Sequence, residues 1–269
     1  MAVPTRITVR DLARYKTENR RFAMLTAYDF PTARLLDEAG IPVLLVGDSL
    51  GQVVLGYDTT LPVTMDEMLH HCRAVARGAR NALLIGDMPF GSYQVSVEEG
   101  IRNATCFLKE GGMHGVKIEG PNLELTQALT ERGVPVMAHL GLTPQSVHAL
   151  GGYRVQARSE EDAHLLASHA LELQKAGAFS LVLEAVPSAV ARAVTGALTI
   201  PTIGIGAGPG CDAQVLVIHD LIGFGTGYVG KAPKFVKRYA DVAETIGEAV
   251  SQFRSDVEAG TYPDEQHSY

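Results

Sequence analysis

Short apolar runs alternate along the chain with longer amphipathic segments. Eight of these runs are four to six residues long and rich in Val, Ile and Leu, which is typical of strands buried on both faces. They occupy residues 22–27, 43–47, 82–86, 115–118, 136–140, 180–183, 202–205 and 215–218. The intervening segments repeat apolar residues at helical spacing and predict helices over 31–39, 65–80, 96–110, 123–131, 160–175 and 188–195.

Alternation of strands and helices requires parallel strands joined by right-handed crossovers. Either an open doubly wound sheet or a closed barrel meets this requirement, and eight repeats favour closure. A chain of 269 residues with 46% hydrophobic content is long enough for a (β/α)8 TIM barrel, which commonly takes about 250 residues. We therefore expect the α/β class and a single (β/α)8 catalytic domain over 1–269, with a C-terminal helical extension at 240–259.

The overall charge and the cysteines narrow the class of protein. A formal net charge of −7 provides no basic surface for a phosphate backbone, so nucleic acid is not an expected partner. The three cysteines, Cys72, Cys106 and Cys211, are widely spaced and are expected to be reduced thiols. The sequence has no run of 18 apolar residues and no signal-peptide pattern, so we expect a cytoplasmic protein without a membrane partner.

Four of the apolar runs end on a carboxylate, at Asp48, Asp87, Glu119 and Glu184. In a parallel barrel these side chains gather at the C-terminal rim, where (β/α)8 enzymes place their active sites. A single Asp after a strand is more often a helix cap or a turn residue, in about two cases of three. Three acids from consecutive strands reverse those odds, and ligation by oxygen alone favours Mg²⁺ at Asp48, Asp87 and Glu119. Zinc is not favoured, because a His and Cys ligand set is missing.

The run Val116-Lys-Ile-Glu119 places Lys117 and Glu119 on one face of a strand, because side chains alternate along it. The aliphatic pair would face the helices and the charged pair the barrel interior. A buried ammonium or carboxylate is costly without an opposite charge, and a metal together with an anionic substrate would satisfy both. Glu184 would remain as a proton-transfer base or as a carboxylate that supports the metal ligands without binding the metal itself.

His139 and two long loops complete the candidate rim. His139 lies on the same side of its strand as Met137 and is either a buried structural residue or a supporting member of the site. The connections 49–64 and 141–159 both follow strands and are long enough to be functional. The glycine-rich run 203–210 lacks the Lys and Ser or Thr of a P-loop and indicates only a tight loop that a ligand can approach closely.

Seven segments carry long motifs that are unusual in combination. They are Leu44-Leu-Val-Gly-Asp-Ser-Leu-Gly51, Gly56-Tyr-Asp-Thr-Thr-Leu-Pro-Val-Thr-Met65, Pro89-Phe-Gly-Ser-Tyr93, Val116-Lys-Ile-Glu-Gly120, His139-Leu-Gly-Leu-Thr-Pro-Gln-Ser146, Leu183-Glu-Ala-Val-Pro187 and Pro201-Thr-Ile-Gly-Ile-Gly-Ala-Gly208. Together these motifs resemble the ketopantoate hydroxymethyltransferase family. Ala213 is a departure, because glycine is expected there in the family, but it lies away from the acids.

The resemblance implies a (β/α)8 barrel of the phosphoenolpyruvate mutase and isocitrate lyase type. It implies an enzyme of pantothenate (coenzyme A) biosynthesis that transfers a hydroxymethyl group from 5,10-methylenetetrahydrofolate to 3-methyl-2-oxobutanoate, giving 2-dehydropantoate. One Mg²⁺ per subunit would stabilise the enolate. The residues implied are Asp48, Asp87 and Glu119 for the metal, Asp48, Ser49, Asp87 and Lys117 for the substrate, and Glu184 as the catalytic base. The family also implies a homo-oligomer, the homodecamer included, whose small-molecule ligands are a 2-oxoacid and folate.

Three other functions fit some of these residues. Lys117 is a candidate nucleophile for a Schiff-base aldolase. A related Mg-dependent oxoacid C–C lyase of the isocitrate lyase type is a nearer relative, but the chain has no cysteine in the Lys-Lys-Cys-Gly-His context of that enzyme. A non-enzymatic binding protein on the same barrel would have little need for four convergent acids and an interior lysine.

Overall fold

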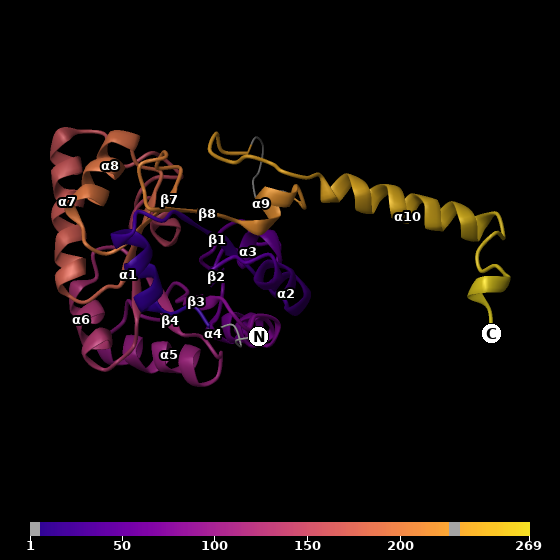
Figure 1. Ribbon diagram of the computed structural model, residues 1–269, viewed down its shortest axis with the longest axis horizontal. Coiled ribbons are helices and arrows are strands. Elements are labelled where there is room, and N and C mark those ends of the chain that lie inside the picture. Colours follow the sequence, from indigo (N-terminus) through magenta and orange to yellow (C-terminus); the bar gives the residue numbers. More distant parts are fainter. Residues whose placement is uncertain (1–5, 226–231) are drawn as a thin grey trace. The chain divides into compact units, whose positions relative to one another are not determined.

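The computed structural model describes residues 6–225 and 232–269 of the chain. Eight parallel strands in this part of the chain form a closed barrel in sequence order (Figure 1). Their bounds are β1 Phe22–Thr26, β2 Val43–Val46, β3 Leu83–Asp87, β4 Gly115–Glu119, β5 Val136–Gly141, β6 Ser180–Glu184, β7 Thr202–Ile205 and β8 Ala213–Leu216. The closed (β/α)8 barrel is confirmed, and the first seven strands agree with the predicted runs to within one residue at each end.

The last strand, β8, begins and ends two residues earlier than the apolar pattern predicts. Asp212 fixes its start, because Asp212 Oδ2 accepts hydrogen bonds from Thr202 N at 2.8 Å and from Lys16 Nζ at 2.9 Å. These bonds hold the chain beside β7, and Ala213 then pairs with Phe22 of β1. The predicted strand therefore ends too late, since its last residue already begins the short helix α9 (Ile218–Ile222).

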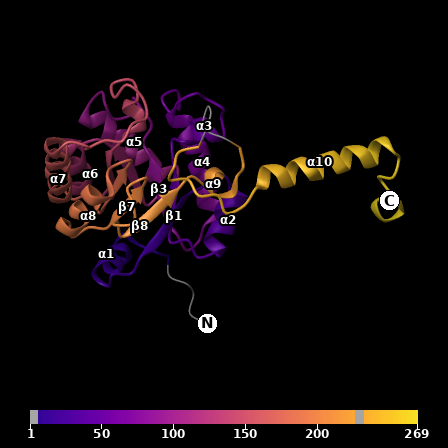
Figure 2. The same ribbon diagram turned by 90° about the horizontal axis from the view of Figure 1, so that it is seen from above.

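Helices lie around the strands and mostly follow the predicted segments (Figures 1 and 2). Their bounds are α2 Phe30–Glu38, α4 Met65–Gly78, α5 Val97–Lys109, α6 Leu123–Glu131, α7 Glu160–Lys175 and α8 Ser188–Ala197. The sequence pattern did not predict α1 (Val9–Thr17), α3 (Leu50–Val53), α9 or the 3-10 turn η1 (Pro144–Ser146). Each of the two long connections, 49–64 and 141–159, thus contains a short helical segment.

Apolar side chains form one layer inside the barrel and another between strands and helices. Leu45, Ile85 and Met137 belong to the interior cluster, to which α1 adds Leu12 and Tyr15. The outer cluster includes Leu140 of β5 and Leu166 of α7. Side chains that alternate along β5 therefore face opposite layers, and the strand ends remain free to carry polar groups into the barrel mouth.

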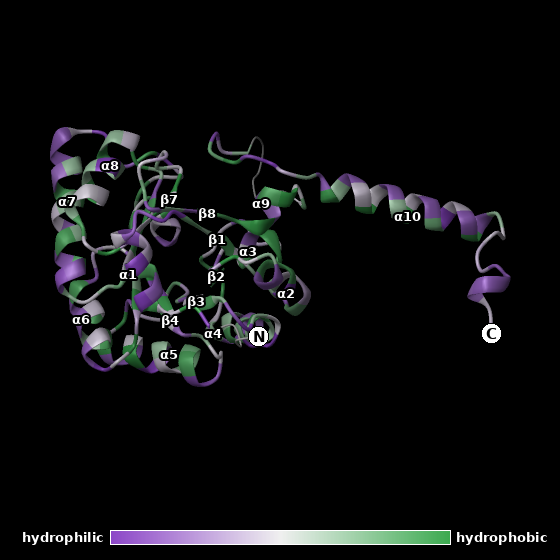
Figure 3. Cartoon of the chain, in the orientation of Figure 1, coloured by the Kyte–Doolittle hydropathy of each residue, from purple (hydrophilic) through white to green (hydrophobic). Residues whose placement is uncertain are grey.

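The chain divides into two compact units, Met1–Val217 and Ile218–Tyr269. The first contains the barrel and every predicted site residue. The second contains α9, α10 (Val242–Glu258) and the 3-10 turn η2 (Glu265–His267), which confirms the helix predicted over 240–259. Figure 3 shows apolar and polar bands along α10. The single catalytic domain over 1–269 stays a prediction. Within residues 6–225 and 232–269, no helix is both long and apolar enough to span a membrane.

Candidate active site

Four carboxylates lie at the C-terminal ends of barrel strands. Asp87, Glu119 and Glu184 are the last residues of β3, β4 and β6, and Asp48 follows the end of β2. Asp48, Asp87 and Glu119 are only 4%, 2% and 7% exposed, and Glu184 is half-buried. The backbone N–H of Asp48 donates to Asp87 Oδ2 at 3.2 Å, so acids from separate strands meet at this rim.

Lys117 lies among three of these acids, as the alternation along its strand predicted. Its Nζ is 2.7 Å from Asp87 Oδ1 and 3.7 Å from Glu119 Oε1. Burial opposes the ammonium form, but the charges of Asp87, Glu119 and Asp48 outweigh burial and raise the pKa of Lys117 above its usual value. The side chain is therefore a fixed positive charge inside the mouth of the barrel.

One ammonium does not neutralise this group of acids. Burial first, and then the charges of Asp87 and Glu119, raise the pKa of Asp48 well above its usual value. Burial also raises the pKa of Asp87 in spite of the Lys117 ammonium. On Glu119 burial acts in the same direction, but hydrogen bonding to His139 and the charge of Lys117 outweigh it and lower the pKa. The ionised forms of Asp48 and Asp87 are therefore disfavoured here, and a bound cation would stabilise them.

His139 joins the acids of two strands. Its Nδ1 is 3.6 Å from Glu119 Oε1 and its Nε2 is 3.3 Å from Glu184 Oε2. Burial and the charge of Lys117 oppose protonation, but the contacts with Glu119 and Glu184 prevail and raise the pKa of His139 to about 9. The sequence left His139 open as either a buried structural residue or a supporting member of the site. These contacts fit the second interpretation.

Ser49 stands at the start of α3, directly after Asp48. Its Oγ is 2.9 Å from the hydroxyl of the buried Tyr28, and its side chain makes no capping hydrogen bond to α3. The hydroxyl is thus held beside the acids and is not used to cap the helix. The assignments of Asp48, Ser49, Asp87 and Lys117 to the substrate remain predictions, as does that of Glu184 as base.

The backbone around Glu184 adopts a rarely populated conformation. The carbonyl oxygen of Glu184 accepts a hydrogen bond from Leu142 N at 2.8 Å. Gly141 has φ +96°, and a Cβ atom there would collide with the same carbonyl oxygen. Ala185 has φ +47°, which is uncommon for a residue with a side chain. Backbone held in such regions is concentrated at functional sites, because the surrounding structure must maintain it.

Two residues that the sequence analysis did not single out also reach the acids. Gln145, in η1, donates from its backbone N–H to Glu119 Oε2 and from its side chain to Asp48 Oδ2, both at 2.9 Å. Tyr93, in the β3–α5 loop, donates its hydroxyl proton to Gln145 Oε1 at 2.6 Å. Both lie inside motifs that carry the family resemblance, and Gln145 lies in a long connection expected to be functional.

The acids fit a hard cation by their chemistry. Glu119 Oε1 is buried, and its nearest positively charged neighbours in the described residues, His139 and Lys117, lie beyond ordinary hydrogen-bond length at 3.6 Å and 3.7 Å, so the oxygen can still accept a ligand. In the described ranges no three His, Cys, Asp or Glu side chains form a ready-made metal cage. Mg²⁺ needs no such cage, because it commonly takes one or two carboxylates and completes its shell with water and substrate. The ligand set Asp48, Asp87 and Glu119 stays a prediction.

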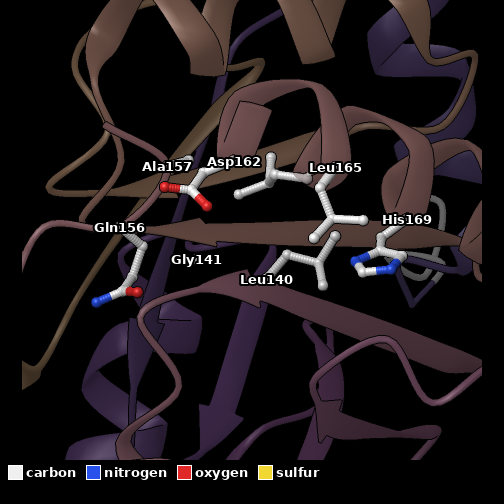
Figure 4. Close-up of a pocket in the computed structure, with 8 residues that line it drawn as sticks. Leu140, Gly141, Gln156, Ala157, Asp162, Leu165 and His169 are labelled. Atoms are coloured by element: carbon white, nitrogen blue, oxygen red, sulfur yellow. The ribbon is translucent and has the colours of Figure 1, made fainter. Parts of the chain in front are cut away.

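A pocket of about 210 Å³ lies elsewhere along β5 and α7 (Figure 4). Its lining consists of Leu140, Gly141, Gln156, Ala157, Asp162, Leu165, Leu166 and His169. Leu140 packs with Leu166 in the outer apolar cluster, whereas the neighbouring His139 contacts the acids. The pocket therefore opens on the helix side of β5 and contains none of the predicted site residues.

Solved structures similar to this one share its barrel fold. Phosphonopyruvate hydrolase, in a complex with oxalate and Mg²⁺, matches with a TM-score of 0.60 at 14% identity, covering 97% of this chain and 93% of the other. The 2,3-dimethylmalate lyase, described as a member of the PEP mutase/isocitrate lyase superfamily, matches with a TM-score of 0.58 at 14% identity. The match covers 97% of this chain and 91% of the other. These matches confirm the (β/α)8 fold, and the phosphoenolpyruvate mutase and isocitrate lyase type of barrel stays a prediction.

Sequence comparisons are more specific. The 3-methyl-2-oxobutanoate hydroxymethyltransferase of Thermobifida fusca is 55% identical over 266 residues, which cover 98% of this chain and 94% of that protein. The enzyme of the same name from Pelobacter propionicus is 54% identical, and the match covers 98% of this chain and 97% of that protein. The family model described as ketopantoate hydroxymethyltransferase matches residues 6–265. The chain therefore belongs to the ketopantoate hydroxymethyltransferase family.

Proposed function

We propose that the protein transfers a hydroxymethyl group from 5,10-methylenetetrahydrofolate to 3-methyl-2-oxobutanoate, giving 2-dehydropantoate in pantothenate biosynthesis. The observation that carries the proposal is the buried contact of Lys117 with Asp87, beside further acids, in a chain of the ketopantoate hydroxymethyltransferase family. The names of relatives at 55% and 54% identity support the oxoacid substrate. The acids and the lysine supply the base and the positive charge that such a transfer needs.

The reaction begins with loss of the proton on C3 of the oxoacid. We assign this proton to Glu184, because Glu184 is more exposed than the other three acids and can meet an incoming substrate. His139 Nε2, at 3.3 Å from Glu184 Oε2, would restrict the movement of this carboxylate. Lys117 offsets the negative charge that develops on the enolate oxygen. C3 then bonds to the one-carbon unit, whose bonds to the two folate nitrogens break, and water supplies the hydroxyl group. The proton that Glu184 took from C3 and the remaining proton of the water go to these nitrogens, and tetrahydrofolate leaves.

Asp48, Asp87 and Glu119 would hold one Mg²⁺ next to Lys117. When bound, this ion supplies Lewis acidity at the oxygens of the oxoacid. The raised pKa of Asp48, whose ionised form a cation would stabilise, and the buried Glu119 Oε1, which makes no hydrogen bond of ordinary length, support this assignment. Treatment with a chelator should remove turnover, and added Mg²⁺ should restore it.

The most informative assay follows tetrahydrofolate release from 3-methyl-2-oxobutanoate and methylenetetrahydrofolate. Glu184→Gln should still bind the oxoacid but should slow exchange of its C3 hydrogen into deuterated water by about 10²- to 10⁴-fold, the usual contribution of a general base. Glu131→Gln, on the exposed side of α6, is the matched control and should exchange normally. Normal exchange in Glu184→Gln would remove Glu184 from this role.

A Schiff-base aldolase would need Lys117 as a neutral amine. The raised pKa of Lys117, which the charges of the neighbouring acids cause against the effect of burial, opposes that route. Borohydride with the oxoacid should therefore leave the protein active, whereas a chelator should inactivate it. The opposite pattern would support an imine, and cleavage of the oxoacid without folate would support a C–C lyase.

We also propose a cytoplasmic homo-oligomer. Helix α10 supports assembly, because Ile246, Val250, Phe253 and Val257 recur at helical spacing and are all exposed in this structure. A second copy of the chain would cover these side chains. Sedimentation velocity should give a mass several times that of one chain, and Val250→Asp together with Phe253→Asp should lower it. An unchanged mass in that double variant would place the contact elsewhere.

A further inference from the structure

Gln145 uses every hydrogen-bonding position of its side-chain amide. The Nε2 group donates to Asp48 Oδ2 and to Met88 O, both at 2.9 Å. Oε1 accepts from Tyr93 Oη at 2.6 Å and from Gln94 Nε2 at 3.3 Å. An amide offers two donors and two acceptor positions, so nothing remains unused in this buried side chain.

This pattern allows one orientation of the amide. Rotation by half a turn would bring Oε1 against the carboxylate of Asp48 and the carbonyl of Met88, and two acceptors cannot bond each other. Gln145 therefore presents a fixed N–H to Asp48.

The same residue also holds a second acid. Its backbone N–H donates to Glu119 Oε2 at 2.9 Å, while the backbone N–H of Glu119 donates to Tyr93 Oη at 3.1 Å. Gln145 and Tyr93 thus connect Asp48, which follows β2, with Glu119 at the end of β4. With Oε2 occupied, the other oxygen, Oε1, faces Lys117 and His139 at 3.7 Å and 3.6 Å.

We propose that Gln145, supported by Tyr93, is a positioning residue that fixes which oxygens of Asp48 and Glu119 face the cation and so sets how tightly the site binds it. The inference rests on the proposed divalent cation at these acids. The physical reason is that an unsupported carboxylate rotates among several rotamers, and a ligand must then order it at the cost of affinity. A neutral amide provides this support without adding charge to a rim where the ionised forms of Asp48 and Asp87 are already disfavoured.

Gln145→Met tests the inference, because methionine keeps the length of the side chain and removes its four hydrogen bonds. The backbone N–H to Glu119 remains, so the variant isolates the amide. Binding of Mn²⁺ to the full chain, followed by the electron paramagnetic resonance of the free ion, should weaken by about 10- to 100-fold, as for other residues that orient metal ligands. Tyr93→Phe, which removes one hydroxyl, should weaken Mn²⁺ binding in the same direction and provides a second test should Gln145→Met not fold.

Gln174→Met is the matched control. Gln174 Oε1 accepts from Thr199 N at 2.7 Å and Ile200 N at 3.2 Å, ahead of the start of β7 and away from the acids. The control should bind Mn²⁺ like the wild type. This should hold even if thermal unfolding in EDTA shows that Gln174→Met and Gln145→Met lose the same stability. Turnover of Gln145→Met should need more Mg²⁺ for half-maximal rate and approach the wild-type rate when Mg²⁺ saturates.

The outcomes separate this inference from the proposed function. Wild-type Mn²⁺ affinity in both Gln145→Met and Tyr93→Phe would overturn the positioning role and leave the cation site standing. If Gln174→Met weakened Mn²⁺ binding as much as Gln145→Met does, the Gln145 amide would be only a general stabilising contact, and this result would also overturn the role. Failure of the wild type itself to bind Mn²⁺ would refute the cation site and the positioning role together.

Discussion

Replacement of Lys117 by methionine tests the charge balance of the rim. Lys117 is 4% exposed, and its Nζ is 2.7 Å from Asp87 Oδ1. The variant leaves the buried acids without their internal cation, and removal of one partner from a buried ion pair usually costs about 3–5 kcal/mol of unfolding free energy. We expect a loss near the lower end, about 3 kcal/mol, because the methionine stem preserves the packing of the lysine chain.

Divalent cation should change this loss. In the wild type, Mg²⁺ at a hundredfold excess over its dissociation constant adds about 2.7 kcal/mol to the unfolding free energy. In Lys117→Met the same acids lack the competing ammonium, so Mg²⁺ should bind more tightly and recover part of the loss. Urea unfolding in EDTA and in Mg²⁺ measures both values.

Lys16→Met is the control for that experiment. Lys16 Nζ pairs with Asp212 Oδ2 at 2.9 Å, outside the group of acids, and both side chains are largely buried. Its variant should lose the same free energy in EDTA and in Mg²⁺. A Lys117→Met loss that is equally independent of Mg²⁺, or a Lys117→Met variant as stable as the wild type in EDTA, would refute the role of Lys117 as the internal cation of these acids.

Two further predictions concern backbone geometry and acid stability. An alanine in the left-handed region costs about 1–2 kcal/mol of unfolding free energy. Gly141→Ala, at φ +96° and against the carbonyl of Glu184, should lose more than this and should slow C3 exchange. Gly120→Ala, at φ +83° with open space around it, should lose only this amount and should exchange normally. Burial alone would raise the pKa of Asp37, but hydrogen bonds from Arg80, Ala82 and Asn81 lower it below 3.8, so its stabilisation is present above that pH. Asp37→Asn should therefore cost about 2 kcal/mol at neutral pH, and this cost should shrink as pH falls below 3.8 through the lowered folded-state pKa; a constant difference across that range would contradict the assignment.

The acids and the lysine were predictable because their placement depends on strand periodicity. A strand of known direction puts its last residue at the rim, and Lys117 and Glu119 share a face whenever their segment is extended. The barrel strands meet these conditions, so Asp87, Glu119 and Glu184 lie at strand ends as expected. The same periodicity says less about β8, whose start depends on the bonds made by Asp212.

Gln145, Tyr93 and the inner helix α1 were not predictable in this way. Gln145 reaches Asp48 across 97 positions of sequence, through a loop whose path depends on the folded barrel. Tyr93 meets it from a different loop. Helix α1 buries only Leu12 and Tyr15 among charged neighbours, so its apolar stripe is too sparse to stand out from a surface segment.

The charge of the proposed substrate explains why such a rim would need a metal as well as a lysine. A 2-oxoacid is an anion, and it would enter a mouth where burial and mutual repulsion already raise the pKa of Asp48 and Asp87. The ammonium of Lys117 is already 2.7 Å from Asp87, so its charge is largely compensated before the substrate arrives. A divalent cation that neutralises two carboxylates would free this ammonium for the developing enolate. The acids that repel the substrate are then the groups that bring in the charge needed to bind it.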